Sequence, residues 1–274
     1  METTHDLVTT LSFDTSLGRI RARVTGDGPT AVLWHGMFVD GRSWDAVTPR
    51  LRLRRRLVVL DAPGYGMSDE LTRLSTIEEC AEVAAQIIAQ LPGGGPVDWL
   101  GTAWGGHVGM TTAALYPQLI RSLVAISSPV EPIDPVFRIK LIIASGAVAR
   151  LGPIAHLRHA MHDAQLTKAH QRDAGLTSLV DSAVTAVSPK GLARTVTSFI
   201  INRTDATHRL PRILAPSLLI AGDDRGEWSP EIMAAAAAHM PDVRTVVIAG
   251  ARTLVQAEQP DAAAGAIEAF WDDL

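Results

Sequence analysis

The chain has 274 residues, of which 47% are hydrophobic and 20% are charged, with a formal net charge of −4. This length and composition provide enough apolar surface for one packed domain, which argues against intrinsic disorder. The mildly acidic balance gives no broad basic field, and the one dense basic run, Arg50 to Arg56, precedes a strand-like segment. We therefore expect no nucleic acid partner.

The chain carries no sign of export or of a membrane anchor. Cys80 is the single cysteine, so no internal disulfide can form, and the N-terminus lacks a basic start followed by an apolar core. No uninterrupted apolar stretch reaches the roughly 20 residues that a membrane helix needs. We expect a cytoplasmic protein that does not span a membrane, and its oligomeric state is left open.

Strand-like apolar runs recur along most of the chain, with helical segments between them. Continuous apolar strands that alternate with helices are typical of a parallel sheet covered on both faces. The expected strands are Arg19–Val24, Ala31–Trp34, Leu57–Leu60, Val97–Gly101, Ser122–Ile126, Ser217–Ala221 and Val243–Ile248. The expected helices are Ser75–Leu91, Trp104–Tyr116 and Pro260–Trp271.

The alternation stops between about Pro129 and Leu214. Apolar residues there are spaced three or four apart, which indicates helices, and Gly152, Pro153 and Pro189 interrupt them. The sequence therefore predicts an α/β core formed by residues 1–128 and 215–274, with a helical cap inserted at 129–214.

Three motifs and two downstream segments resemble those of the α/β-hydrolases. LGTAWGG at 100–106 has the spacing of the G-x-S-x-G nucleophile elbow, between a strand and a helix. WHGMF at 34–38 resembles the family's His-Gly oxyanion segment, and LDAPGYGMSD at 60–69 its D-x-P-G-x-G-x-S turn. LLIAGDDRGEWSP at 218–230 and IAGARTLVQAEQP at 248–260 resemble the segments that carry the triad acid and histidine. The resemblance implies a mostly parallel α/β-hydrolase sheet flanked by helices.

The chain departs from the family at two catalytic positions. Ala103 stands where the family has its nucleophilic serine, and Thr253 stands where it has its histidine. In a working triad the serine attacks a carbonyl and the histidine takes its proton. Loss of the nucleophile alone removes a factor of roughly a million in turnover in a well-studied triad. Hydrolysis through a serine triad is therefore not expected.

Part of the family's catalytic equipment does not depend on these two side chains. The resemblance assigns the oxyanion hole to the backbone N–H groups of Met37 and Trp104. It places Asp223 or Asp224 at the acid position, where either could serve as base or anchor if burial raises its pKa. His107 lies four residues after Ala103, one turn along the same helix face, and is a further candidate base.

We expect substrate contacts from residues that adjoin these motifs. The candidates are His35, Phe38, Ala103, Arg252 and Thr253. A structural role is the alternative for each of them, in the core, in a loop or at the surface. The chain has no Gly-rich phosphate loop and no known zinc pattern around its cap histidines, so we expect neither a cofactor nor a metal.

Three functions compete at this point. The first is a cofactor-independent, non-hydrolytic enzyme, such as a cyclase, lyase or isomerase of secondary metabolism, acting on a hydrophobic carbonyl compound. The second is a binding protein or scaffold that kept the pocket without the chemistry. The third is an ester hydrolase inactivated by engineering. A haloalkane dehalogenase is disfavoured, because that class uses an aspartate at the elbow.

Overall fold

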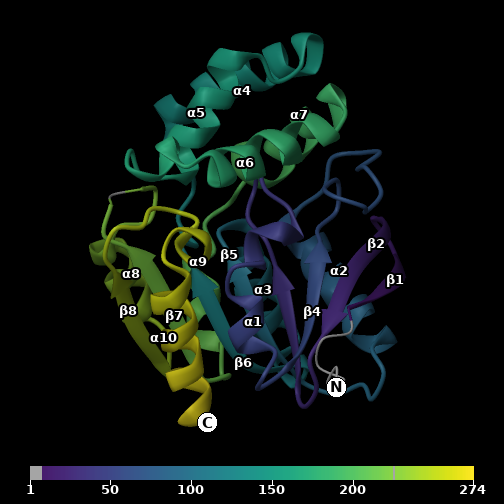
Figure 1. Ribbon diagram of the computed structural model, residues 1–274, viewed down its shortest axis with the longest axis vertical. Coiled ribbons are helices and arrows are strands. Elements are labelled where there is room, and N and C mark those ends of the chain that lie inside the picture. The colour runs from purple at the N-terminus through teal and green to yellow at the C-terminus, as the bar shows by residue number, and fades with distance from the viewer. Residues whose placement is uncertain (1–7, 225) are drawn as a thin grey trace.

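The computed structural model describes residues 8–224 and 226–274, which are built around an eight-stranded sheet (Figure 1). The spatial order is β1-β2-β4-β3-β5-β6-β7-β8. The strands are β1 Thr9–Thr15, β2 Gly18–Thr25, β3 Thr30–Trp34, β4 Arg56–Asp61, β5 Val97–Thr102, β6 Ile120–Ile126, β7 Ser217–Gly222 and β8 Val243–Ile248. β1 and β2 run antiparallel to their neighbours and the other pairs are parallel. The expected mostly parallel sheet is confirmed, with β1 as an added edge strand.

Helices cover both faces of the sheet. Helices α2 and α3 bury their apolar side chains in one core cluster, and α1 and α10 bury theirs in a second cluster on the opposite face. The helices outside the cap are α1 Thr48–Leu51, α2 Ile77–Gln90, α3 Trp104–Leu115, α8 Pro230–Ala237, α9 Val255–Glu258 and α10 Pro260–Asp272, with short 3-10 turns η2 Gly41–Trp44 and η3 Pro117–Leu119. A capping box between Thr76 and Glu79 fixes the start of α2.

The segment after β6 forms a separate helical layer at one end of the molecule (Figure 1). It contains α4 Pro135–Leu151, α5 Ala155–Gln165, η4 His170–Arg172, α6 Ala174–Ala186, α7 Pro189–Val196, the π-helical turn η5 Thr197–Ile201 and η6 Thr207–Arg212. Helix α4 packs on α7, and it ends at Gly152, whose φ of 74° stops the helix. Among the described helices, none combines the length and apolar character needed to cross a membrane.

Candidate functional site

Ala103 occupies the turn between β5 and α3 in a strained conformation. Its φ is 48° and its ψ is −110°, and its amide donates to the Ile126 carbonyl at 2.7 Å. A non-glycine residue at positive φ costs on the order of 1 kcal/mol or more. The flanking glycines make the turn possible, because a Cβ on Gly105 would lie 2.1 Å from the Trp34 carbonyl oxygen and one on Gly101 would lie 2.2 Å from the Gly105 backbone. The sharp elbow therefore persists although the nucleophile is gone.

Two backbone amides beside this turn have no acceptor in the described part of the chain. Met37 follows β3, and Trp104 is the first residue of α3, where helix amides lack an intrahelical partner. The two segments are adjacent, since a Cβ on Gly36 would lie 3.5 Å from the Ala103 Cβ. The positive end of the α3 dipole adds to the potential at this point. Such an arrangement can bind a carbonyl oxygen and stabilise negative charge on it.

His35 and Phe38 are part of the framework of the loop after β3. The His35 Nε2 accepts from the Ala62 amide at 2.9 Å, so its Nδ1 carries the proton and donates to the Gly36 carbonyl at 2.6 Å. Burial lowers the pKa of this histidine, which is completely enclosed, and the ring is neutral. Phe38 is buried at a φ of 66°, and its amide donates to the Tyr65 hydroxyl at 3.4 Å.

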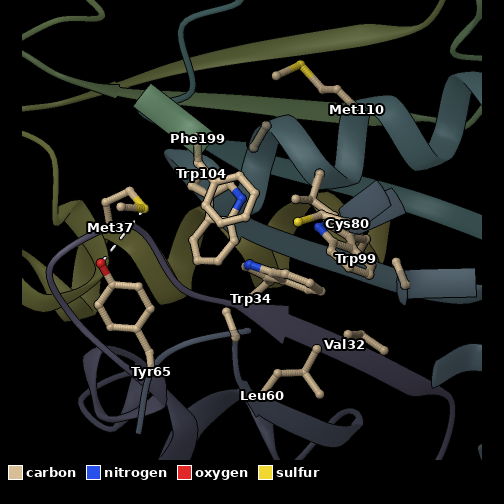
Figure 2. Close-up of a cluster of buried hydrophobic side chains, with 14 of the residues drawn as sticks. Val32, Trp34, Met37, Leu60, Tyr65, Cys80, Trp99, Trp104, Met110 and Phe199 are labelled. Atoms are coloured by element: carbon tan, nitrogen blue, oxygen red, sulfur yellow. Dashed lines mark hydrogen bonds between the residues drawn. The ribbon is translucent and has the colours of Figure 1, made fainter. Parts of the chain in front are cut away.

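The Trp104 side chain joins a cluster of aromatic residues at the junction of core and cap. Figure 2 shows its indole against Phe199 of the cap turn η5, and the ring centroids are 4.3 Å apart at an angle of 18°. Trp34 meets the same indole edge-on at 5.6 Å. Tyr65 also contacts this indole, with ring centroids 6.1 Å apart, and it donates its hydroxyl to the Met37 sulfur at 3.9 Å. Burial raises the pKa of Tyr65 to about 12, so this hydroxyl is protonated at neutral pH.

The two candidate acids both hold the loop that contains Arg252. The Asp223 carboxylate accepts from the Gly250 amide at 2.7 Å. The Asp224 carboxylate accepts from the Arg252 guanidinium at 3.2 Å, in a pair that is about one-third exposed. Asp224 and Arg252 are therefore brought together, and both aspartates already have hydrogen-bond partners.

Thr253 fastens the cap to the core. Its hydroxyl donates to the Ala164 carbonyl at 2.9 Å, and its amide donates to the Gln165 carbonyl at 3.2 Å, both at the end of α5. Where the resemblance expects a catalytic base, this chain has a contact between layers. The hydroxyl is engaged as a donor.

Glu258 strengthens the same junction, and the sequence analysis did not single it out. Its fully buried carboxylate accepts from the Thr167 amide at 2.7 Å, from His170 Nδ1 at 3.0 Å and from the Arg252 amide at 2.7 Å. The only signal in the sequence is a glutamate inside the otherwise uncharged turn VQAEQ. We call the contacts of Thr253 and Glu258 with the cap the cap latch.

His107 lies one turn along α3 from Ala103 and is buried. Its ring is beside Arg203 and the Pro129 carbonyl, but neither nitrogen makes a well-formed hydrogen bond with the described residues. Burial, and secondly the charge of Arg203, lower the pKa of His107 to about 3. The ring is neutral at physiological pH, and the described contacts do not join it to Asp223 or Asp224.

Two hollows of the described surface lie outside the elbow. One of about 390 Å³ lies between α4 and α7, and the other of about 310 Å³ lies between η2 and α6. Neither is lined by Met37, Ala103 or Trp104. The stacked Trp104 and Phe199 rings join the core to the cap beside the elbow, and Ala103 itself is half-buried.

The fold, the elbow and the order of the motifs define an α/β-hydrolase. The model of the alpha/beta hydrolase family matches residues 31–266, so the chain belongs to this family. It is 32% identical over 235 residues to a pimeloyl-[acyl-carrier protein] methyl ester esterase of Xanthomonas oryzae, covering 83% of this chain and 88% of that protein. It is 25% identical over 270 residues to the 2-(acetamidomethylene)succinate hydrolase of Mesorhizobium japonicum, covering 93% of each.

Solved structures of enzymes share the whole architecture. A thermophilic esterase from Thermogutta terrifontis superposes with a TM-score of 0.88 at 25% identity, covering 97% of this chain and 98% of that one. An enol-lactonase from Burkholderia xenovorans has a TM-score of 0.87 at 18% identity, covering 96% and 100%. These relatives and neighbours are named as hydrolases.

Proposed function

We propose that this chain acts on a hydrophobic carbonyl compound without hydrolysing it, by polarising the carbonyl at the amides of Met37 and Trp104. The observation that carries the proposal is that the adjacent amides of Met37 and Trp104 have no acceptor among the described residues, although Ala103 has no hydroxyl. The ester carbonyl named for the Xanthomonas esterase is the kind of group that such amides receive.

The hydrogen bonds that the candidate side chains already make limit the classes of reaction that this site could catalyse. His35, Asp223, Asp224 and Thr253 already have hydrogen-bond partners. His107 lies near the elbow without a well-formed hydrogen bond, but its pKa of about 3 makes it a weak base. Reactions in which charge gathers on a carbonyl oxygen and no acyl-enzyme forms suit this site best. Cyclisation, elimination and isomerisation meet that condition, with water or the substrate itself exchanging the proton. The two hydrogen bonds of Thr253 to the cap support natural divergence over deliberate inactivation of a hydrolase.

A binding protein is the second candidate, and one observation favours it. Trp104 stacks on Phe199 and ties the cap to the core beside the elbow, which suits a ligand held between the two layers without turnover. The two candidates share the binding of a carbonyl group and differ in whether its bound form becomes more reactive.

Exchange of the protons next to a ketone separates the two candidates. The probes are straight-chain 2-alkanones of six to twelve carbons in D2O, followed by proton NMR, because ketones cannot be hydrolysed. Stabilisation of the enolate oxygen predicts exchange that is on the order of a hundred-fold faster than in buffer, the size of effect of one oxyanion donor.

Two variants of Ala103 provide the control. Ala103→Leu fills the space beside the amides and is expected to abolish the acceleration, whereas Ala103→Ser changes the volume little and retains it. If ketones bind but their protons do not exchange faster, the result favours the second candidate, a binding protein. Ketones that exchange equally fast with Ala103→Leu would refute the role of the elbow.

A further inference from the structure

The outer face of α4 is unusually apolar for an exposed helix. Seven of the fifteen large hydrophobic side chains that are exposed among the described residues lie between positions 136 and 154: Val136, Phe137, Ile139, Ile142, Ile143, Leu151 and Ile154. Ile143 is 69% exposed and Val136 is 63% exposed, while Ser145 and Val148 on the opposite side are buried. Val136, Ile139 and Ile143 are three and four residues apart, so they share one side of the helix, and an exposed apolar face of this kind marks an interaction surface.

Cations without matching acids lie on α4 and on the neighbouring helix α7. From Pro135 to His162 the sequence contains no aspartate or glutamate. Five basic residues of α4 and α7, namely Arg138, Lys140, Arg150, Lys190 and Arg194, form no ion pair with any described carboxylate. The three arginines donate to backbone carbonyls instead, which leaves their charge unneutralised.

The charge is distributed unevenly between the layers. Residues 129–214 contain eleven Lys and Arg against six Asp and Glu, although the whole chain has a net charge of −4. The cationic, apolar helix also lies at the extreme end of the molecule, farthest from the sheet (Figure 1). Only this end would be drawn toward an anionic surface.

We propose that the outer face of α4 docks the cap on an anionic lipid surface. Aliphatic side chains would enter the boundary between headgroups and acyl chains, and the basic side chains would lie among the phosphates. Two facing α4 helices of a dimer would bring their unpaired cations together, and the other exposed apolar residues are scattered along the chain. A lipid surface satisfies both the charge and the apolar area, and this inference does not depend on the elbow.

Vesicle flotation with the full chain tests the proposal. We expect association with vesicles of phosphatidylcholine and phosphatidylglycerol at three to one, and little association with phosphatidylcholine alone. Burying one isoleucine is worth about ten-fold in affinity. Ile139→Ser with Ile143→Ser is therefore expected to weaken binding on the order of a hundred-fold, and raising the salt concentration weakens it further. Leu53→Ser, which removes a 68% exposed leucine elsewhere, is the matched control and leaves binding unchanged.

A reporter in the unaltered face keeps the test independent of the serine variants. Phe137→Trp, at a position 47% exposed, is expected to give a blue-shifted emission with anionic vesicles only. If the chain binds neither vesicle type, the proposal is refuted, and a protein partner becomes the explanation for this face. A dimer in solution that Ile139→Ser with Ile143→Ser dissociates also refutes it, as does equal binding to both vesicle types.

Discussion

At the scale of single residues, the elbow has the family's strained backbone turn but lacks its nucleophilic side chain. The backbone of Ala103 keeps the strained turn and the amide of Trp104, while its methyl group supplies no nucleophile. Thr253 takes part in the cap latch instead of accepting a proton. We propose that a site changed in this way still binds a carbonyl oxygen, although it has lost the side chains that form an acyl-enzyme.

His107 makes the stability of the fold depend on pH. Its pKa is about 3 in the folded chain and about 6.5 when unfolded, so between these values only the unfolded state binds the proton. Folding stability is therefore expected to fall as the pH drops below about 6.5, by up to roughly 1.4 kcal/mol per pH unit until about pH 3. His107→Leu, which removes an imidazole without well-formed hydrogen bonds, is expected to flatten this dependence.

Urea unfolding between pH 4 and pH 8 measures this effect. His239→Leu, at an exposed histidine, is the control and is expected to keep the slope of the original chain. If His107→Leu and the original chain lose stability equally on acidification, the burial of this ring is not the cause.

At the scale of elements, the cap latch connects α5 and the turn before α6 to the loop before α9 and to α9 itself. Glu258 accepts three hydrogen bonds with a side chain that water does not reach. Glu258→Gln is expected to cost about 2–4 kcal/mol, because the new amide NH2 faces donors and the lost charge leaves them unsatisfied. Urea unfolding measures the cost, and limited proteolysis between 163 and 172 reports on the loosened cap.

Asp261→Asn is the matched control for the latch. Asp261 begins the neighbouring helix α10 with a 98% exposed side chain, and its change is expected to stay within about 0.5 kcal/mol. A Glu258→Gln variant as stable and as protease-resistant as this control would show that the latch does not hold the cap.

The sequence predicted strands β2 to β8 well, including the edge strand β8, and predicted strand β1 and the latch poorly. Strands β3 to β7 are continuous apolar runs because both of their faces are covered. Strand β1 was missed because it lies at the edge of the sheet, and of its seven residues only Phe13 is buried. Glu258 was missed because two of its three partners, Thr167 and His170, lie about 90 positions earlier in the chain, and no local pattern brings them together.

For the candidate site, too, the sequence predicted local features and missed contacts between distant segments. The motif spacings located Met37, Ala103 and Trp104 correctly relative to the sheet, because strand ends and glycine turns are local features. The spacing did not foresee that Trp104 would stack on Phe199, since that contact joins α3 to a cap turn 95 positions later. Contacts between layers depend on tertiary packing, which periodicity does not encode.

At the scale of the whole molecule, the two layers differ in charge. The core contains the elbow and its amides, and the cap is cationic and has α4 on its side away from the sheet (Figure 1). In this arrangement a hydrophobic carbonyl compound would be held between the layers, with its oxygen toward the amides of Met37 and Trp104.

Carbon-13 NMR of a labelled carbonyl tests this central claim most directly. Methyl esters of four to twelve carbons, labelled at the carbonyl carbon, are titrated with the chain and with Ala103→Leu. We predict a downfield shift of the bound carbonyl signal, no released methanol and no added mass on the protein, and Ala103→Leu is expected to remove the shift. A carbonyl signal that does not move for any ester, or an acylated protein, would contradict the account.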